Sequence, residues 1–142
     1  MDIIFDIDDT LVTASHREHL YRGEETDWKE FYEQSLYDPW INSSVEALLG
    51  LYNLGHKVLL VTGRHEMARE VTIEKMKGIP YSALYMRPPN FIGSNAECKQ
   101  ALLSTIRDDG FAPVAAFEDN PKSAEMWKKN GLIVYKVEHE LL

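Results

Sequence analysis

Short apolar runs alternate with amphipathic segments along most of this chain. Each apolar run is bounded by polar or turn-forming residues, which predicts buried strands over 3–5, 57–61, 83–86, 114–117 and 132–135. Between them, apolar residues recur every three or four positions and a glycine follows the last turn. This pattern predicts helices over about 43–54, 66–77, 95–109 and 121–130.

Capping residues indicate where these helices begin. Ser43 stands three residues before Glu46, a spacing typical of a capping box. Ser94 or Asn95 is expected to cap the third helix. The Asn-Pro pair at 120–121 predicts an N-cap followed by a proline at the first helical position.

Strands that alternate with helices indicate an α/β fold. We expect a single Rossmann-like domain over 1–142, with a five-stranded parallel sheet and helices on both of its faces. The least regular part is 12–41, with one short helix near 28–32 that Thr26 or Asp27 would cap. We interpret 12–41 as a small lid-like insertion.

Acidic residues follow the first strand directly. Asp6 and Asp8 are two positions apart, so both carboxylates can point the same way if the backbone stays extended. Close carboxylates repel one another, and a divalent cation offsets this repulsion. Mg²⁺ commonly takes one or two carboxylates together with phosphate oxygens and water. By itself, an Asp-x-Asp pattern is more often a cap or a solvated turn.

Other polar residues stand at the ends of later strands. Thr62-Gly63-Arg64 follows the second strand, Arg87 the third, and the pair 118–119 the fourth. Ligands of parallel sheets bind beyond the carboxyl ends of the strands, so one fold would gather these residues around one site. Alternatively, Thr62 only caps a turn, and Arg64 is as well explained by a surface position.

Asp6, Asp8 and Thr10 form the pattern Asp-x-Asp-x-Thr, which resembles the first motif of the haloacid dehalogenase (HAD) superfamily. Asp9 occupies a position that is often glycine in that motif. The resemblance implies a HAD-like fold, here with a minimal cap, and Mg²⁺-dependent hydrolysis of a phosphomonoester. It also implies an aspartyl-phosphate intermediate, which divides one difficult displacement into two steps.

The same resemblance implies roles for individual acids. Asp6 would be the nucleophile and a Mg²⁺ ligand, while Asp8 would protonate the leaving oxygen and reach the metal through its backbone carbonyl. Glu118 and Asp119 resemble the fourth motif and would complete the metal site, with Asp119 the more direct ligand. Glu118 stands where the superfamily usually has an aspartate.

Thr62 resembles the second motif, and its hydroxyl together with the Gly63 amide would hydrogen-bond a phosphate oxygen. For the third motif we choose Lys99, which would neutralise the charge of the phosphate and of Asp6. Lys122 is the main rival for this role. Alternatively, Lys99 is only a solvated lysine on the surface of its helix.

A narrower resemblance rests on Ser-His-Arg at 15–17, Val-Thr-Gly-Arg at 61–64 and Tyr-Met-Arg at 85–87. These segments are similar to the 3′-phosphatase domain of bacteriophage-type polynucleotide kinases. In that domain, arginines near the site contact the substrate phosphate. The implied substrate-binding residues are Arg87, His16, Arg17, Arg64, Gly63 and Thr10.

The resemblance implies hydrolysis of a phosphate on a nucleotide or at a nucleic acid 3′ end. A 5′-nucleotidase or another small-metabolite phosphatase of the superfamily is the alternative. A non-catalytic phosphate-binding domain or a phospho-acceptor signalling domain fits the pattern less well. The chain has no Gly-x-x-x-x-Gly-Lys-Ser/Thr loop, so a kinase activity is not expected from it.

Charge and composition narrow the possible partners. The formal net charge of −8 argues against extended binding to duplex nucleic acid and favours a mononucleotide or a short single-stranded end. Cys98 is the single cysteine, so no intramolecular disulfide forms, and no apolar run is long enough to span a bilayer. We therefore expect a cytoplasmic protein without a membrane segment, and the sequence shows no feature that requires a protein partner.

Overall fold

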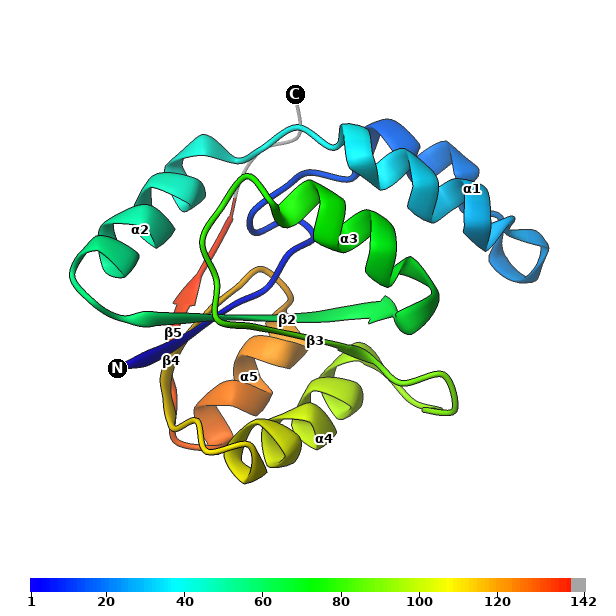
Figure 1. The fold of residues 1–142 in the computed structure, drawn as a ribbon. Coiled ribbons are helices and arrows are strands. Elements are labelled where there is room, and N and C mark those ends of the chain that lie inside the picture. Colours follow the sequence, from blue (N-terminus) through cyan, green and yellow to red (C-terminus); the bar gives the residue numbers. More distant parts are fainter. Residues whose placement is uncertain (139–142) are drawn as a thin grey trace.

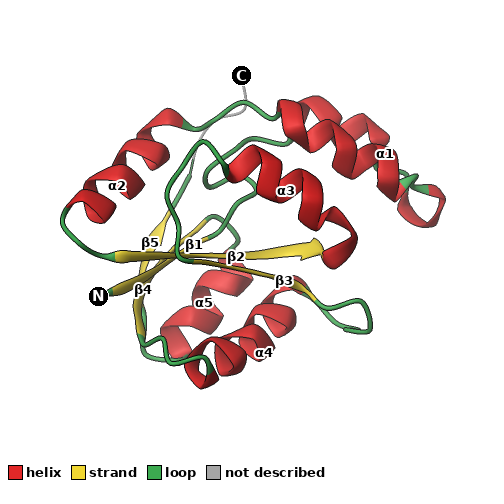
Figure 2. Cartoon of the chain, viewed as in Figure 1, coloured by secondary structure: helices red, strands yellow, loops and turns green. Residues whose placement is uncertain are grey.

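The computed structural model describes residues 1–138 and contains a five-stranded sheet in which every strand pair is parallel (Figures 1 and 2). The strand order is β3-β2-β1-β4-β5, which confirms the predicted α/β fold. The strands are β1 (Asp2–Phe5), β2 (Lys57–His65), β3 (Ala83–Arg87), β4 (Pro113–Glu118) and β5 (Ile133–Lys136).

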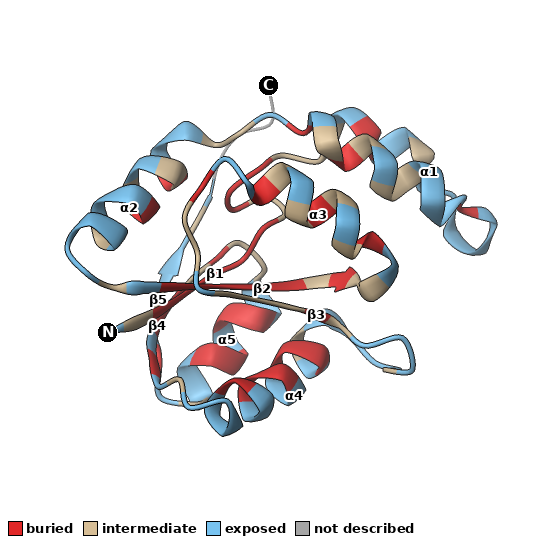
Figure 3. Ribbon diagram, viewed as in Figure 1, coloured by how far each residue is buried: buried red, intermediate tan, exposed pale blue. Residues whose placement is uncertain are grey.

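Helices cover both faces of this sheet. In Figure 1, α2 (Asn42–Asn53) and α3 (Arg69–Met76) lie over one face, and α4 (Asn95–Asp108) and α5 (Pro121–Lys129) lie over the other. Successive residues of β1 point to opposite faces, as the strand period of two requires. Ile3 and Phe5 belong to the core beneath α2 and α3, and Ile4 belongs to the core beneath α4 and α5. Figure 3 shows buried residues along the central strands and in the helices on both faces.

The predicted cap of α4 is present, with Ser94 in the capping position. The Ser94 hydroxyl accepts a hydrogen bond from the Glu97 backbone N–H, and the Glu97 carboxylate accepts one from the Ser94 N–H. Helix α1 (Trp28–Glu33) is likewise capped, by Asp27 and not by Thr26.

The capping box expected at Ser43 was wrong. Helix α2 begins at Asn42, one residue earlier, and Ile41 precedes it without a side-chain cap. The backbone N–H of Ile41 instead donates to the Leu11 carbonyl at 2.7 Å. This pairing with the segment after β1 fixes where the chain turns into α2.

Strand β2 is longer than its apolar run. It continues through Thr62, Gly63 and Arg64 to His65, although the register with β3 shifts after Val61. A 3₁₀ turn over Glu66–Ala68 then precedes α3, where one continuous helix was expected. The polar residues predicted to follow the strand therefore lie inside it, on rigid backbone.

The segment 12–41, called here the lid segment, consists of short helical turns. It contains 3₁₀ helices over Ser15–Leu20, Gly23–Glu25 and Gln34–Tyr37, and α1 lies between the last two. Figure 1 shows these turns on the side of the sheet that carries α3, near the carboxyl end of β2. Backbone hydrogen bonds between 11–13 and 39–41 hold the two ends of the lid segment together.

Among the residues that the structure describes, none of the helices combines the length and the apolar character that a bilayer crossing needs.

Candidate active site

The strand order places the carboxyl ends of β1 and β4 side by side. After β1 the chain builds the sheet outward through β2 and β3, and it then crosses back to form β4 on the other side of β1. Ligands of open α/β sheets bind at such a switch point. Here the Asp6 backbone N–H donates to the Phe117 carbonyl at 3.0 Å, so the acids that follow the two strands are neighbours.

Asp6 and Lys99 form the centre of the site. The Lys99 Nζ donates to Asp6 Oδ1 at 2.9 Å and to Glu118 Oε1 at 2.7 Å, and the Thr10 hydroxyl donates to Asp6 Oδ2 at 3.0 Å. Burial alone would lower the pKa of Lys99, but the two carboxylates raise it above its usual range. Lys99 is therefore a charged lysine whose position is fixed. Lys122 is exposed, so the geometry favours Lys99 for the third motif.

Three carboxylates converge beside this lysine. Asp6, Glu118 and Asp119 each offer an oxygen, and these oxygens all lie within 4.8 Å of one another. Burial, the hydrogen bond with Asp6 and the repulsion of the neighbouring acids raise the pKa of Asp119. Oxygen ligands crowded in this way suit a hard divalent cation, which relieves the repulsion.

Glu118 is the more engaged member of the acidic pair. Its side chain accepts hydrogen bonds from Lys99 Nζ, from the Trp127 indole N–H at 3.1 Å and from the Asn120 backbone N–H at 3.3 Å. Both residues line the cavity, but Glu118 is fully buried whereas Asp119 is half-buried. Asp119 thus has the freer carboxylate for a metal, and Glu118 holds Lys99 in place.

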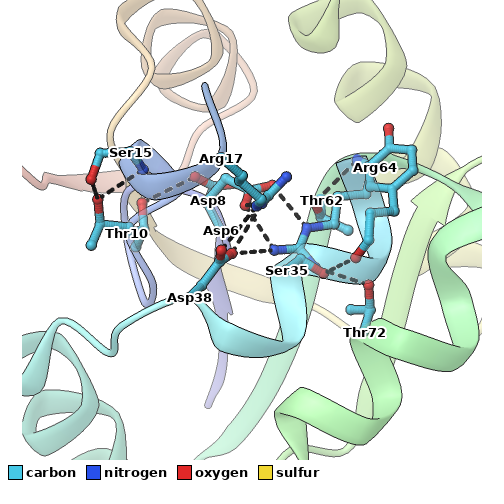
Figure 4. A network of polar contacts seen from close by, with 12 residues as sticks. Asp6, Asp8, Thr10, Ser15, Arg17, Ser35, Asp38, Thr62, Arg64 and Thr72 are labelled. Carbon is cyan, nitrogen blue, oxygen red and sulfur yellow. Dashed lines mark hydrogen bonds and ion pairs between the residues drawn. The ribbon is translucent and has the colours of Figure 1, made fainter. Parts of the chain in front are cut away.

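The Asp8 carboxylate contacts two arginines (Figure 4). Arg64 donates from Nε to Asp8 Oδ2 at 2.9 Å and from Nη2 to Oδ1 at 2.8 Å, and Arg17 Nη2 donates to Oδ1 at 2.9 Å. Burial alone would raise the pKa of Asp8, but the charges of the arginines and their hydrogen bonds hold it below its usual range. In this arrangement the candidate general acid is ionised.

Asp38 joins the same network and was missed in the sequence. It is fully buried, and its Oδ1 accepts from Arg17 Nε at 2.9 Å and pairs with His16 Nε2 at 2.6 Å. Its Oδ2 accepts from Arg17 Nη2 at 3.0 Å and from Arg64 Nη2 at 3.3 Å. The sequence shows only an aspartate before Pro39 in an irregular segment, which is typical of a turn.

Arg64 is an interior residue. It is 3% exposed, and its Nη1 donates to the Thr72 hydroxyl at 3.0 Å and to the Ser35 hydroxyl at 3.3 Å. These contacts tie β2 to α3 and to the lid segment as well as to Asp8. The alternative of a surface position for Arg64 was therefore wrong.

Arg87 is fixed beside the loop between β3 and α4. Its guanidinium donates to the Gly63 carbonyl at 3.1 Å, to the Gly93 carbonyl at 3.0 Å and to the Asn95 side-chain oxygen at 2.8 Å. A Cβ atom at Gly63 would lie 2.4 Å from that Asn95 oxygen, so only glycine fits there without a shift. The Thr62 hydroxyl, next to this contact, accepts from the Arg64 backbone N–H at 3.1 Å.

The loop after β1 needs an unusual backbone at Asp9. Asp9 has a φ of +61°, in the left-handed region that glycine adopts most easily, which agrees with the glycine often found there in the motif. The chain then turns back, and the N–H groups of Thr10, Leu11 and Val12 all approach the Ile7 carbonyl. This tight turn directs the Thr10 hydroxyl onto Asp6.

One cavity of about 710 Å³ contains nearly all of the predicted site residues. Its size is typical of small-molecule sites. Two of the predicted site residues, all of which the structure describes, do not line it: His16 contacts Asp38, and Thr10 contacts Asp6. The predicted residues that line the cavity are Asp6, Asp8, Arg17, Thr62, Gly63, Arg64, Arg87, Lys99, Glu118 and Asp119.

Comparison with known proteins agrees with this geometry. A family model described as the polynucleotide kinase PNKP phosphatase domain matches residues 1–140. The chain belongs to this family. It is a HAD-type phosphatase, an enzyme that hydrolyses phosphomonoesters, as the sequence predicted. A stretch of 77 residues, 51% of the chain, is 36% identical to "Acid phosphatase 1" of Solanum lycopersicum and covers 30% of that protein.

Solved structures share the fold at low identity. The structure of a Pnkp1/Rnl/Hen1 complex contains a chain that is 22% identical with a TM-score of 0.81, and the match covers 96% of this chain and 45% of that one. The class C acid phosphatase of Bacillus anthracis is 13% identical with a TM-score of 0.67, covering 96% of this chain and 66% of that one. This phosphatase thus spans less than half of the Pnkp1-complex chain and under a third of the tomato relative.

Proposed function

We propose that this phosphatase removes the 3′-phosphate from a nucleotide or from the end of a nucleic acid, through a covalent phosphate on Asp6. The observation that carries the proposal is the position of Asp6, whose carboxylate is held by Lys99 and Thr10 in the same cavity as Arg17, Arg64 and Arg87. Aspartate is a known covalent nucleophile in phosphoryl transfer.

In the first step, one Asp6 oxygen attacks the phosphorus, and the bond to the sugar oxygen breaks. The leaving oxygen takes a proton, and the phosphoryl group stays on Asp6 as an acyl phosphate. In the second step water attacks that phosphorus, loses a proton to a base and releases inorganic phosphate, which restores Asp6. Lys99 lowers the repulsion between the Asp6 carboxylate and the phosphate in both steps.

Asp8 is the group proposed to move both protons. The two arginines orient its carboxylate and favour its ionised form, which suits the base that accepts a proton from the attacking water. Its action as an acid in the first step requires that it first takes up a proton. Asp8 must therefore be protonated in the first step and ionised in the second.

Asp6 and Asp119 are the residues proposed to hold Mg²⁺, with Glu118 nearby and the Asp8 backbone carbonyl as a further ligand. The three clustered carboxylates fit such an ion because oxygen is the ligand atom it prefers. When bound, Mg²⁺ supplies positive charge that offsets the charge of the phosphate oxygens.

The family supports a nucleic acid end as the substrate, and the similar Pnkp1 chain is part of what is described as an RNA repair complex. The similarity to acid phosphatases supports the second candidate, a 5′-nucleotidase or a phosphatase of other small metabolites. A non-catalytic or phospho-acceptor domain finds no support in these relatives.

A substrate panel tests the choice. Initial rates are compared for 3′- and 5′-phosphorylated mononucleotides, for oligonucleotides phosphorylated at either end, and for glycerol phosphate, each with Mg²⁺. We expect the highest kcat/KM for a 3′-phosphate. A higher value for 5′-phosphates would establish the nucleotidase alternative, and a higher value for glycerol phosphate would exclude a nucleic acid substrate.

A further inference from the structure

The phosphoryl chemistry leaves one side of the cavity unexplained. Tyr21, Trp28, Phe31 and Tyr32 of the lid segment line the same cavity as Asp6 and Lys99, and we call these four residues the aromatic wall. We propose that the aromatic wall binds the nucleobase of the terminal nucleotide by stacking while its phosphate lies at Asp6. This inference rests on the proposed function and assigns its substrate-binding surface.

Ring contacts make the aromatic wall one packed cluster with Trp28 at its centre. The centroid of Trp28 lies 5.9 Å from Tyr21 and 5.4 Å from Phe31, both edge-on, and 5.7 Å from Tyr32, which is stacked on it. Edge-on and offset-stacked contacts at these distances are the favoured arrangements of aromatic pairs. The wall therefore has a defined shape before any ligand binds.

The wall is also accessible. Tyr21 is 59% exposed and Trp28 is 38% exposed, so their rings do not serve only to fill a core. Small-molecule sites are typically lined by aromatic side chains together with a few placed polar groups, which is the composition of this cavity. Tyr21 lies at the margin of the cluster, where one edge-on contact with Trp28 supports it.

The wall is connected to the catalytic network through Arg17. The Arg17 guanidinium carbon lies 4.6 Å from the centroid of the Phe31 ring, and the same guanidinium binds Asp8 and Asp38. A ligand on the wall is thus held in a fixed relation to the residues that surround the phosphate.

The two ends of the cavity restrict what one ligand can be. It must carry a phosphate for the residues around Asp6 and a flat ring for the aromatic wall. Because Arg17 contacts both Phe31 and Asp8, it lies between these two parts, and the ligand needs a spacer there. A nucleotide meets this description because its sugar separates base and phosphate, and every base offers a stacking face. Phosphotyrosine carries its phosphate on the ring itself, so it lacks the spacer.

The test compares two substrates that differ only in the terminal base. One is a short single-stranded oligonucleotide with a 3′-phosphate, and the other ends in a tetrahydrofuran abasic residue that carries the same 3′-phosphate. Stacking on a protein ring contributes enough affinity for its loss to raise KM about tenfold. We expect that rise for Tyr21→Ala and Trp28→Ala on the base-bearing substrate, and a change below about twofold on the abasic one.

Tyr37→Ala is the matched control, since Tyr37 is 68% exposed, belongs to the lid segment and lies outside the cavity lining. It should leave KM unchanged on both substrates. Tyr21→Phe and Trp28→Phe retain a ring and should restore most of the affinity. An equal rise in KM on the two substrates, an unchanged KM in both alanine variants, or faster hydrolysis of a phosphotyrosine peptide would overturn the proposal.

A binding measurement separates this inference from the proposed function. In Asp6→Asn combined with Trp40→Phe, Trp28 is the half-exposed tryptophan, because Trp127 is buried. A base-bearing 3′-phosphorylated oligonucleotide should quench the fluorescence, and the abasic one should not. Quenching without turnover in the wild type would reject the 3′-phosphatase assignment and retain the stacking site. Equal quenching by both ligands would reject the stacking site alone.

Discussion

Asp38 and Arg17 form a buried two-point ion pair: Arg17 Nε lies 2.9 Å from Asp38 Oδ1, and Arg17 Nη2 lies 3.0 Å from Asp38 Oδ2. The Asp38 side chain is 0% exposed and that of Arg17 is 2% exposed. The same Nη2 atom also reaches Asp8. A buried charge is tolerated when it is paired and its hydrogen bonds are formed. Here Arg17 donates hydrogen bonds to both Asp38 and Asp8. The pair thereby fixes the position of Asp8.

Replacing Asp38 tests this relationship. In Asp38→Asn the two arginines keep their charge but lose half of their buried counter-charge, so we expect a loss of about 3 kcal/mol in the free energy of unfolding. We also expect kcat to fall, because Asp8 loses its fixed position. Urea unfolding and steady-state kinetics measure the two effects. Glu33→Gln, at an exposed site in α1, is the control, and an Asp38→Asn protein that matches it would refute the positioning role.

Asp6→Asn should abolish turnover and leave the fold intact. The amide is a poor nucleophile, and we expect para-nitrophenyl phosphate hydrolysis with Mg²⁺ to fall by about 10³-fold or more. Lys99 keeps Glu118 as a partner, so the melting temperature should change little. Activity at the wild-type level would remove the aspartyl-phosphate mechanism.

Asp8→Ala should slow the release of poor leaving groups more than that of good ones. A proton donor matters most when the departing oxygen is strongly basic, as in an alkyl phosphate, and least for para-nitrophenolate. The measurement is kcat/KM across phosphate esters of graded leaving-group pKa. A uniform reduction over the series would count against Asp8 as the acid.

Lys99 and Lys122 make a direct comparison of two lysines. Lys99→Met leaves Asp6 and Glu118 buried without their cation, so we expect kcat/KM to fall by about 10²-fold and stability by about 3 kcal/mol. Lys122→Met, at an exposed position at the start of α5, should change neither. A larger loss of kcat/KM in Lys122→Met than in Lys99→Met would assign the role of the third motif to Lys122.

Magnesium should stabilise the protein more at high pH than at low pH. The pKa of Asp119 is raised in the fold by burial and by neighbouring acids, so the folded metal-free protein binds protons more tightly than the unfolded chain. The contribution of Asp119 to stability is therefore greatest below the unfolded carboxyl pKa of about 4 and is lost as pH rises through the raised value.

Because Mg²⁺ binds the ionised carboxylates, it should recover this lost stability. Melting temperatures with and without Mg²⁺ at pH 5 and pH 8.5 test the prediction, with Asp119→Asn as the control. A Mg²⁺-induced gain that is the same at both pH values would show that Asp119 does not take part in the metal site.

The part of the site that the sequence predicted is the part that topology determines. Asp6 and Asp119 directly follow buried strands and Thr62 lies near the end of one, and parallel strands bring their carboxyl ends to one edge. Lys99 was chosen as the third motif of the resembled superfamily, since it lies near the start of the helix that returns to β4, and Lys122 remained its rival. Chain order and the resemblance together selected these residues.

Asp38 could not be found in this way because no strand end or helix period positions it. Its place depends on how the lid segment folds back, which backbone pairing of Thr13 with Pro39 and of Leu11 with Ile41 determines. The same pairing shifted the start of α2 away from the expected cap at Ser43. Contacts between distant irregular segments leave no periodic signal in a sequence.

The lid segment provides both the aromatic wall and two members of the charged network, Arg17 and Asp38. Under the two proposals, ligand binding and the positioning of Asp8 therefore both depend on the same thirty residues. A chimera that carries a foreign insertion in place of 12–41 would acquire a new ligand preference only if the insertion also provides an arginine and an aspartate that contact Asp8 and Arg64 as Arg17 and Asp38 do.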